Sequence, residues 1–195
     1  QDYHKTRQYL AKLDSKVRRA RRRIRRFSGR GKGRTFLDVG CNAGFAVAAA
    51  AQLGYVANGI DIDDEAVKLA TEKFSAGSFE KISAQQLALR GEQFDIIYCS
   101  EFIEHLPALT DFLDALRTLM HDDSRLFITT PDLGHFTLHA PFNYEPLIDW
   151  DAVRPPEHLY YFNRHNLQRL LNRCGFRQVR FSWNSKPTLK AVVRL

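Results

Sequence analysis

The chain has 195 residues, of which 44% are hydrophobic, so it can bury one substantial core, and one domain is expected. Residues 1–34 hold 14 Lys and Arg against two Asp, a net of +12, whereas residues 35–195 hold 15 Lys and Arg against 20 Asp and Glu, a net of −5. The three scattered cysteines argue against a disulfide framework, and the sequence has neither a ~20-residue apolar run nor a signal-peptide apolar region, so we expect a cytoplasmic protein.

The chain begins with a predicted basic helix. It starts at Gln1 rather than Met, so residues can precede it. Residues 5–27 lack turn residues, and their apolar side chains roughly follow one helical face: Tyr9, Leu10, Leu13, Val17, Ala20, Ile24 and Phe27. Residues 28–33 are rich in Gly and predict a flexible break. We therefore divide the chain into a basic helical arm, residues 1–34, and a body, residues 35–195.

The body alternates strands with helices. The predicted strands are Thr35–Val39, Val56–Ile62, Phe79–Ile82, Phe94–Ser100 and Arg125–Thr130. The predicted helices between them are Phe45–Leu53, Asp64–Phe74 and Pro107–Met120. This alternation is typical of parallel β-α-β units in an open, doubly wound α/β sheet.

The pattern changes after Pro131. Residues 132–162 are rich in aromatics, Pro and His without periodicity, and a segment of this length and composition is typical of a functional lid. A helix is predicted over Asn163–Cys174, followed by strands over Phe176–Trp183 and Leu189–Leu195. The short turn between these strands predicts an antiparallel closing hairpin.

A glycine loop follows the first predicted strand, in the stretch FLDVGCNAGF of residues 36–45. Ligands of open α/β sheets bind beyond the carboxyl ends of the strands, and Gly40 and Gly44 let the backbone turn tightly there. The spacing G-x-x-x-G differs from the G-x-G-x-x-G that binds a pyrophosphate. It favours a ligand without phosphates, with an amino or carboxylate group beside Asp38 and the loop amides. The alternative is a tight turn with a structural role only.

An acidic residue ends the second predicted strand, in the stretch GIDID of residues 59–63. A carboxylate at this position can accept hydrogen bonds from both hydroxyls of a ribose. Alternatively, Asp61 or Asp63 only caps the following helix, because Asp is a favoured N-cap residue. We expect Asp63 to cap the helix and Asp61 to bind the ribose.

Four stretches together resemble the ordered motifs of class I S-adenosylmethionine-dependent methyltransferases: FLDVGCNAGF, GIDID, FDIIYCSEFIEHL and RLFITTPD. The resemblance covers residues 35–195 and is nearest to the small-molecule branch with the ubiquinone-biosynthesis O-methyltransferases. It implies a Rossmann-like α/β fold, with a mostly parallel seven-stranded sheet, an antiparallel closing strand and helices on both faces. It also implies S-adenosylmethionine as cofactor, with S-adenosylhomocysteine as product.

The resemblance assigns the cofactor contacts residue by residue. The loop faces the methionine part of the cofactor, Asp61 holds the ribose and Ile62 lies against adenine. After the third strand the family tends to have an acidic residue, where this chain has Ser83-Ala84-Gln85; Ser83 or Gln85 can replace that hydrogen bond. The implied cofactor-binding residues are Asp38, Gly40, Asn42, Gly44, Asp61, Ile62, Ser83, Ala84, Gln85 and Glu101.

Two of these assignments carry alternatives. Asn42 replaces a family glycine, and Asn tolerates the left-handed backbone better than most residues. Glu101 is placed near the sulfonium by the resemblance, but it can equally be an ordinary loop residue, and His105 is expected to be structural. Pro107 supports a helix start just after them.

Residues 132–162 are expected to cover the methyl acceptor. Within them His158 is our candidate general base, since a neutral imidazole can take the proton of an attacking hydroxyl, and adjacent Glu157 can orient the ring. The competing interpretation is that His158 only tethers the lid. A metal bound by His135, His139 and His158 is not expected, because their spacings match no strong ligand pattern.

We therefore predict methyl transfer to a small-molecule nucleophile, with oxygen preferred. One alternative is an RNA or protein methyltransferase recruited by the arginines of Arg18–Arg26; another is a non-catalytic cofactor-binding module. The loop spacing disfavours a nicotinamide dehydrogenase. The arginines can serve an anionic partner, RNA or a lipid surface, or form a solvated face of a helix that covers the cofactor pocket.

Overall fold

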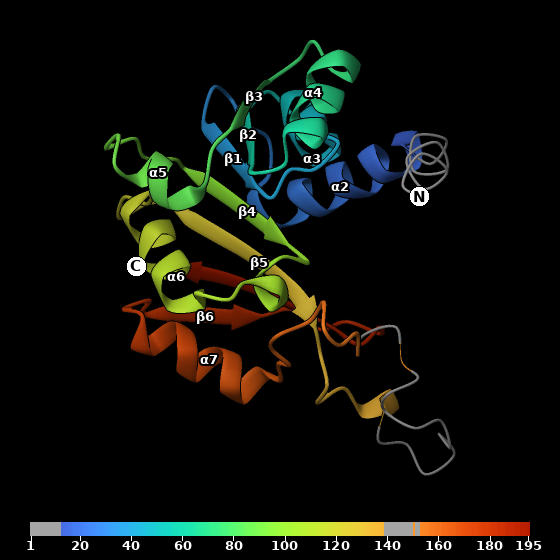
Figure 1. Cartoon of the computed structure of the whole chain (residues 1–195), viewed down its shortest axis with the longest axis vertical. Coiled ribbons are helices and arrows are strands. Elements are labelled where there is room, and N and C mark those ends of the chain that lie inside the picture. The colour runs from blue at the N-terminus through green and yellow to red at the C-terminus, as the bar shows by residue number, and fades with distance from the viewer. Residues whose placement is uncertain (1–12, 139–149, 151–152) are drawn as a thin grey trace. The chain divides into compact units, whose positions relative to one another are not determined.

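The structure is a computed structural model that describes residues 13–138, 150 and 153–195 (Figure 1). Seven strands make up a mixed sheet, mostly parallel, with an antiparallel closing strand and helices around it, which confirms the predicted fold class. The chain divides into two compact units, Gln1–Ser83 and Ala84–Leu195.

The sheet of the first unit has three parallel strands in the order β3-β2-β1. These are β1 (Thr35–Val39), β2 (Val56–Asp61) and β3 (Ser78–Lys81), joined through α3 (Phe45–Ala51) and α4 (Asp64–Lys73). β1 is buried almost throughout, and α3 is buried along most of its length because Ala is small enough for close packing. The register pairs Asp38 with Gly59 and Val39 with Ile60, so both strands end at the same edge.

The basic helix α2 (Leu13–Ser28) packs on α3 within this unit. Its buried side chains Val17, Ala20 and Ile24 belong to the predicted apolar face, which confirms that part of the helix; residues 1–12 lie outside the described residues. Lys16 Nζ lies 5.6 Å from the ring centre of Phe45, at the start of α3.

The glycine-rich run after α2 ends the helix, as predicted. Hydrogen bonds hold it as a turn, however, so the prediction that it is flexible is wrong. The Arg34 guanidinium donates to the carbonyl of Ser28 at 2.7 Å, and Gly31 N–H donates to Leu53 at 2.8 Å. A Cβ on Gly31 would come within 2.3 Å of the Tyr55 nitrogen. Only glycine allows this approach of two backbone segments.

The second unit contains four strands in the order β4-β5-β7-β6. β4 (Ile96–Ser100) and β5 (Arg125–Pro131) are parallel, whereas β7 (Thr188–Arg194) runs antiparallel to both β5 and β6 (Gln178–Phe181). This arrangement confirms the predicted closing hairpin. The helices of the unit are α5 (Ala84–Ala88), α6 (Leu109–Thr118) and α7 (Arg164–Arg173), with single 3-10 turns η1 (Ile103–His105) and η2 (Phe136–Leu138).

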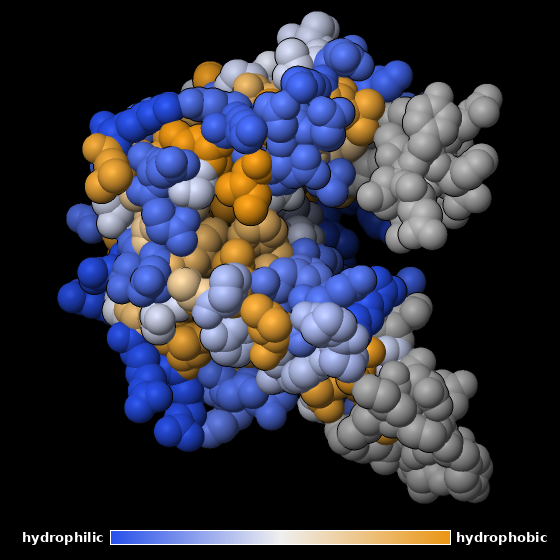
Figure 2. Space-filling view, viewed as in Figure 1, coloured by the Kyte–Doolittle hydropathy of each residue, from blue (hydrophilic) through white to orange (hydrophobic). Residues whose placement is uncertain are grey.

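α7 shows how the sequence sets a helix and its exposed face. Asn163 caps it, since its side chain accepts from Asn166 N–H at 2.9 Å while the Asn166 side chain accepts from Asn163 N–H at 2.8 Å. Leu167 and Leu171 face inward, and the side of α7 turned to the viewer in Figure 2 is mostly hydrophilic. The short helix α5 was not predicted, because five residues are too few to establish a helical period.

Candidate functional site

The loop after β1 has the backbone that the glycine pattern predicts. Gly40 (φ 73°), Asn42 (φ 46°) and Gly44 (φ 77°) are all left-handed. Asn42 is stabilised in this conformation because its Oδ1 accepts from Ala43 N–H at 2.7 Å. A Cβ on Gly44 would lie 2.6 Å from the Phe79 ring, so a larger residue does not fit there. The departure from the family glycine at Asn42 therefore leaves the loop geometry intact.

Both carboxylate oxygens of Asp61 accept backbone hydrogen bonds, one from this loop and one from the residue that caps α4. Oδ2 accepts from Asn42 N–H at 2.8 Å, and Oδ1 accepts from Asp63 N–H at 3.0 Å. The backbone thus fixes the carboxylate beside the turn at the carboxyl ends of β1 and β2. Each oxygen keeps a second lone pair for a donor, as the hydroxyls of a ribose would be.

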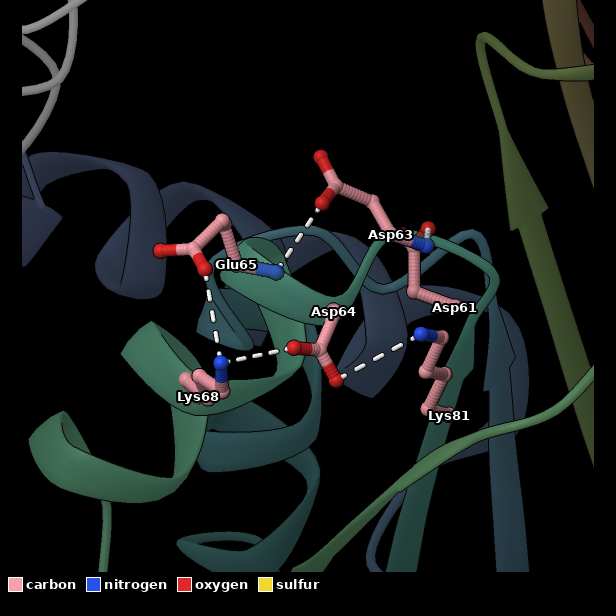
Figure 3. Close-up of polar contacts among 6 residues, drawn as sticks. All are labelled: Asp61, Asp63, Asp64, Glu65, Lys68 and Lys81. Atoms are coloured by element: carbon pink, nitrogen blue, oxygen red, sulfur yellow. Dashed lines mark hydrogen bonds and ion pairs between the residues drawn. The ribbon is translucent and has the colours of Figure 1, made fainter.

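Four charged side chains near Asp61, those of Asp64, Glu65, Lys68 and Lys81, are paired with one another (Figure 3). Asp64 lies 2.7 Å from Lys68 and 3.6 Å from Lys81, and Lys68 also lies 3.4 Å from Glu65. Asp63 caps α4 by accepting from Glu65 N–H at 3.0 Å, as predicted. Asp61 takes part in none of these ion pairs, so its charge is not neutralised by a lysine of this cluster.

Asp38 is the buried acid of the first unit, with 4% of its surface exposed. Burial, and then the negative charge of Asp61, raise the pKa of this carboxyl well above its ordinary value. The same causes, with Asp38 itself, raise the pKa of the Cys41 thiol. Neither carboxylate is ion-paired with a Lys or Arg among the residues that the structure describes, and a cationic ligand group would stabilise two such interacting carboxylates.

The remaining predicted contacts of the cofactor are distributed over both units. Ile62 is 70% exposed next to Asp61, and Ile82 N–H donates to the Asp61 carbonyl at 3.0 Å, one residue before the half-buried Ser83. In the second unit Ala84 is buried and Gln85 exposed, at the start of α5. The first unit therefore brings the loop, Asp61, Ile62 and Ser83 to neighbouring positions.

Glu101 follows β4 in a conformation that glutamate rarely adopts. Its φ is 52°, its side chain is exposed, and its N–H donates to the Thr129 carbonyl at 2.8 Å. A left-handed non-glycine residue costs about 1–2 kcal/mol and is concentrated at functional sites. The sequence gives no sign of this strain, and the strain supports a functional role for Glu101.

Glu104 is a candidate that the sequence reasoning missed. Its side chain is 1% exposed, Oε2 accepts from the Thr130 hydroxyl at 3.0 Å, and Oε1 has no hydrogen-bond partner among the described residues. Burial, and then the charge of Glu101, raise its pKa from 4.5 to about 7. The available signal was a carboxylate that directly follows the apolar pair Phe102-Ile103, but sequence alone does not reveal which way it points.

His158 lies beside Glu104 and His105. The His158 and His105 rings meet edge to face, with centres 4.7 Å apart, and His105 Nε2 lies 4.0 Å from Glu104 Oε1. The three side chains offer ligand or proton-accepting atoms that all lie within 4.8 Å of one another. They are the one set of three His, Cys, Asp or Glu side chains, among the residues described, with the proximity of metal ligands.

Backbone contacts dock the segment of His158 onto η1. Leu159 N–H donates to the Glu104 carbonyl at 2.7 Å and Tyr160 N–H to the same oxygen at 3.2 Å, while His105 Nδ1 lies 2.8 Å from the Glu157 carbonyl. His158 itself is 9% exposed. His105 thus helps to hold this segment in place, the structural role expected of it, and it also lies next to His158, the candidate base.

The other histidines of residues 132–162 do not join this group. His135 is buried, and its Nε2 lies 3.0 Å from the Asn184 carbonyl; His139 and Tyr144 lie outside the described residues. The two ends of the segment meet where Asp132 bridges Phe162.

Cys41, Cys99 and Cys174 are buried thiols that form no disulfide. No helix in the described part of the chain has the length and hydropathy that a membrane crossing requires.

A family model described as a methyltransferase domain matches residues 6–180. Curated relatives include the ubiquinone biosynthesis O-methyltransferases of Haemophilus ducreyi, 30% identical over 107 residues, and of Pseudomonas paraeruginosa, 34% identical over 104 residues. Each match covers 50% of this chain and 45% or 44% of the relative, respectively. The chain thus spans about half the length of the curated relatives it matches.

Solved structures share the fold at low sequence identity. A methyltransferase from Archaeoglobus fulgidus aligns over 100% of both chains with a TM-score of 0.71 and 19% identity. The 1,6-didemethyltoxoflavin-N1-methyltransferase of Burkholderia thailandensis, solved with S-adenosylhomocysteine, aligns over 99% of this chain and 83% of its own, with a TM-score of 0.66 and 20% identity. The chain therefore belongs to the methyltransferase-domain family, has the class I fold, and S-adenosylmethionine is the cofactor of this family.

Proposed function

We propose that the protein transfers the methyl group of S-adenosylmethionine to an oxygen nucleophile of a small molecule. The observation that carries the donor half is the Asp61 carboxylate, which is held by the N–H groups of Asn42 and Asp63 and takes no part in the neighbouring ion pairs of Asp64. The preference for an oxygen acceptor is supported by the curated relatives, which are named O-methyltransferases.

The residues of the first unit fit this cofactor. The left-handed loop offers backbone close to a ligand, with the carboxylates of Asp38 and Asp61, which interact with one another, beside it. We assign Asp38, Gly40, Asn42 and Gly44 to the methionine part, Asp61 to the ribose and Ile62 to adenine. Ser83, Ala84 and Gln85 are assigned to the adenine edge, and Glu101 to the sulfonium.

When bound, the cofactor supplies an electrophilic methyl group on sulfur. His158 would take the proton of the acceptor hydroxyl, so that the acceptor oxygen could receive this methyl group. A neutral imidazole serves as this base, and such proton transfer contributes about 10²–10⁴-fold. His105 orients the His158 ring by packing edge to face on it, and the Glu104 carboxyl lies within 4.8 Å of both imidazoles.

The test is methyl transfer from radiolabelled S-adenosylmethionine to phenolic, sugar and RNA acceptors. We expect label on a phenolic or another hydroxyl-bearing small molecule, and at least tenfold less label with Asp61→Asn when the cofactor concentration is limiting. Label on RNA alone would favour the alternative of an RNA methyltransferase. Cofactor binding without transfer to any acceptor class would favour a non-catalytic module.

Three further statements about the chain stay proposals. We propose a cytoplasmic location, and a division into a basic arm of residues 1–34 and a methyltransferase domain of residues 35–195, in which residues 132–162 cover the acceptor. We also propose that the arginines of Arg18–Arg26 serve an anionic partner. Their exposure supports the last of these.

A further inference from the structure

The outward side of α2 is lined by arginine. Six of its arginines are exposed: Arg18, Arg19, Arg21, Arg22, Arg25 and Arg26. At 3.6 residues per turn these positions fall on one side of the helix, opposite the buried Val17, Ala20 and Ile24. None of the six has an acidic partner within the described ranges 13–138 and 153–195. We call these six residues the arginine face.

The apolar side of α2 is already used. Val17, Ala20 and Ile24 are at most 6% exposed and pack on α3. The C-terminal end is held as well, because the Tyr55 hydroxyl donates to Ser28 Oγ at 2.7 Å and Arg34 binds the Ser28 carbonyl. A membrane-surface helix buries its apolar side among lipid chains. α2 would have to leave its own unit to do so, which disfavours a lipid bilayer as partner.

The chemistry of the arginine face points to phosphate. Residues 18–26 contain seven arginines and no lysine. A guanidinium offers a planar pair of N–H donors that matches two phosphate oxygens. If the helix only needed positive charge, lysine would serve equally well. The exposed side of this stretch has no aromatic residue that could stack on a base.

We propose that the arginine face binds the phosphodiester backbone of a nucleic acid without reading its base sequence. This surface goes beyond the proposed methyl transfer and does not rest on it. Contacts to phosphate carry no sequence information, and a face made of guanidinium groups, without an aromatic residue that could stack on a base, suits phosphate at every position.

The number of arginines sets the size of the expected effect. Six phosphate contacts to a single strand release enough counterions for a slope of about −4 in log K against log salt. Raising the salt from about 50 to 200 mM would then weaken binding roughly 300-fold. Each lost arginine contact should reduce the slope by about 0.7.

The experiment measures fluorescence anisotropy of labelled single-stranded RNA, duplex RNA and duplex DNA with the 195-residue chain over a range of salt. The variant is Arg18→Gln/Arg22→Gln/Arg25→Gln, at the centre of the arginine face. The control is Arg169→Gln/Arg173→Gln/Arg177→Gln, which removes the same charge from exposed positions of the second unit. Circular dichroism checks that both remain folded.

The expected result is salt-dependent binding whose slope falls by about 2 in the α2 variant, with at least tenfold weaker binding, while the control stays within about twofold. The three nucleic acids distinguish RNA from DNA as the source of the phosphates. Equal losses in both variants would overturn the proposal, since net charge would then explain binding. Binding to phosphatidylserine vesicles without binding to any nucleic acid would overturn it too.

Discussion

The backbone N–H of Asn42 donates to Oδ2 of Asp61 at 2.8 Å, across 19 residues of sequence. This bond joins the only non-glycine left-handed residue of the loop after β1 to the acid at the end of β2. The two motifs that the sequence presents separately are therefore one structural unit. A change at either residue should affect the other.

Asp61→Asn should weaken the binding of S-adenosylmethionine tenfold or more. Hydrogen bonds to a charged group are worth about 1.5–3 kcal/mol each, and the amide also disturbs the contacts with Asn42 and Asp63. Isothermal calorimetry measures the change. Asp64→Asn is the matched control, because Asp64 is tied to Lys68 and Lys81 instead. Equal affinities of the wild type and a folded Asp61→Asn would remove Asp61 from the ribose role.

Gly44→Ala and Gly33→Ala separate backbone strain from steric conflict. Both glycines are left-handed, with φ of 77° and 83°, but a Cβ on Gly33 meets nothing within 4 Å, whereas one on Gly44 meets Phe79 at 2.6 Å. Gly33→Ala should therefore cost only the backbone term of about 1–2 kcal/mol. Gly44→Ala should cost about 1–3 kcal/mol more because it overpacks the site. Urea unfolding measures both, and similar losses would show that Phe79 can yield.

Glu104 should make stability depend on pH. Its pKa is raised from 4.5 to about 7, so the folded protein holds this proton more tightly than the unfolded chain. Its contribution is therefore complete below about pH 4.5 and is lost as the pH rises through about 7. Glu104→Gln stays neutral, so the variant should gain stability relative to the wild type from pH 5 to pH 8, by on the order of 3 kcal/mol. Urea unfolding at each pH gives the free energy of unfolding of both proteins. A difference between them that stays constant with pH would contradict the prediction.

His158→Ala should lower turnover about 10²–10⁴-fold and leave cofactor affinity unchanged, if His158 is the base. The control is His135→Ala, which removes another buried histidine with a different partner, the Asn184 carbonyl. Loss of turnover that a higher pH partly restores would fit a missing base, since an ionised acceptor no longer needs one. Near-normal turnover would leave His158 as a tether. Loss of wild-type turnover in EDTA would instead assign the cluster to a cation.

The thiols should be unreactive in the folded protein. All three are buried, and burial raises the pKa of Cys41 and Cys174, which disfavours the reactive thiolate. Ellman's reagent should therefore label none of them quickly under native conditions and all three in guanidinium chloride. Fast native labelling of one thiol would reveal local opening around it.

The fold was predictable because its signals are local and repeated. Apolar runs, acidic first turns and glycine stops located the strands and helices of the body, and Asp63 and Asn163 cap the helices expected at those positions. The loop and Asp61 were predictable for the same reason, since a strand end and a turn fix where their residues lie.

Glu104 could not be predicted in this way. Its role depends on which side of a single 3-10 turn faces inward, and on the docking of a segment more than 50 residues away. The left-handed backbone of Glu101 could not be predicted either, because such a conformation is normally indicated by a glycine and this position has none. The turn at residues 28–33 was misjudged because glycines predict conformational freedom, whereas Gly31 serves close packing.

The hydrogen bonds of Leu159 and Tyr160 to the Glu104 carbonyl allow the opening of this segment to be timed. Both amide protons can exchange with solvent only when the segment lifts from η1. At a pH high enough for exchange to be faster than reclosing, their exchange rates give the opening frequency, measured without any substrate. An acceptor that enters beneath the segment cannot turn over faster than this frequency, and a faster turnover would prove that it enters by another route.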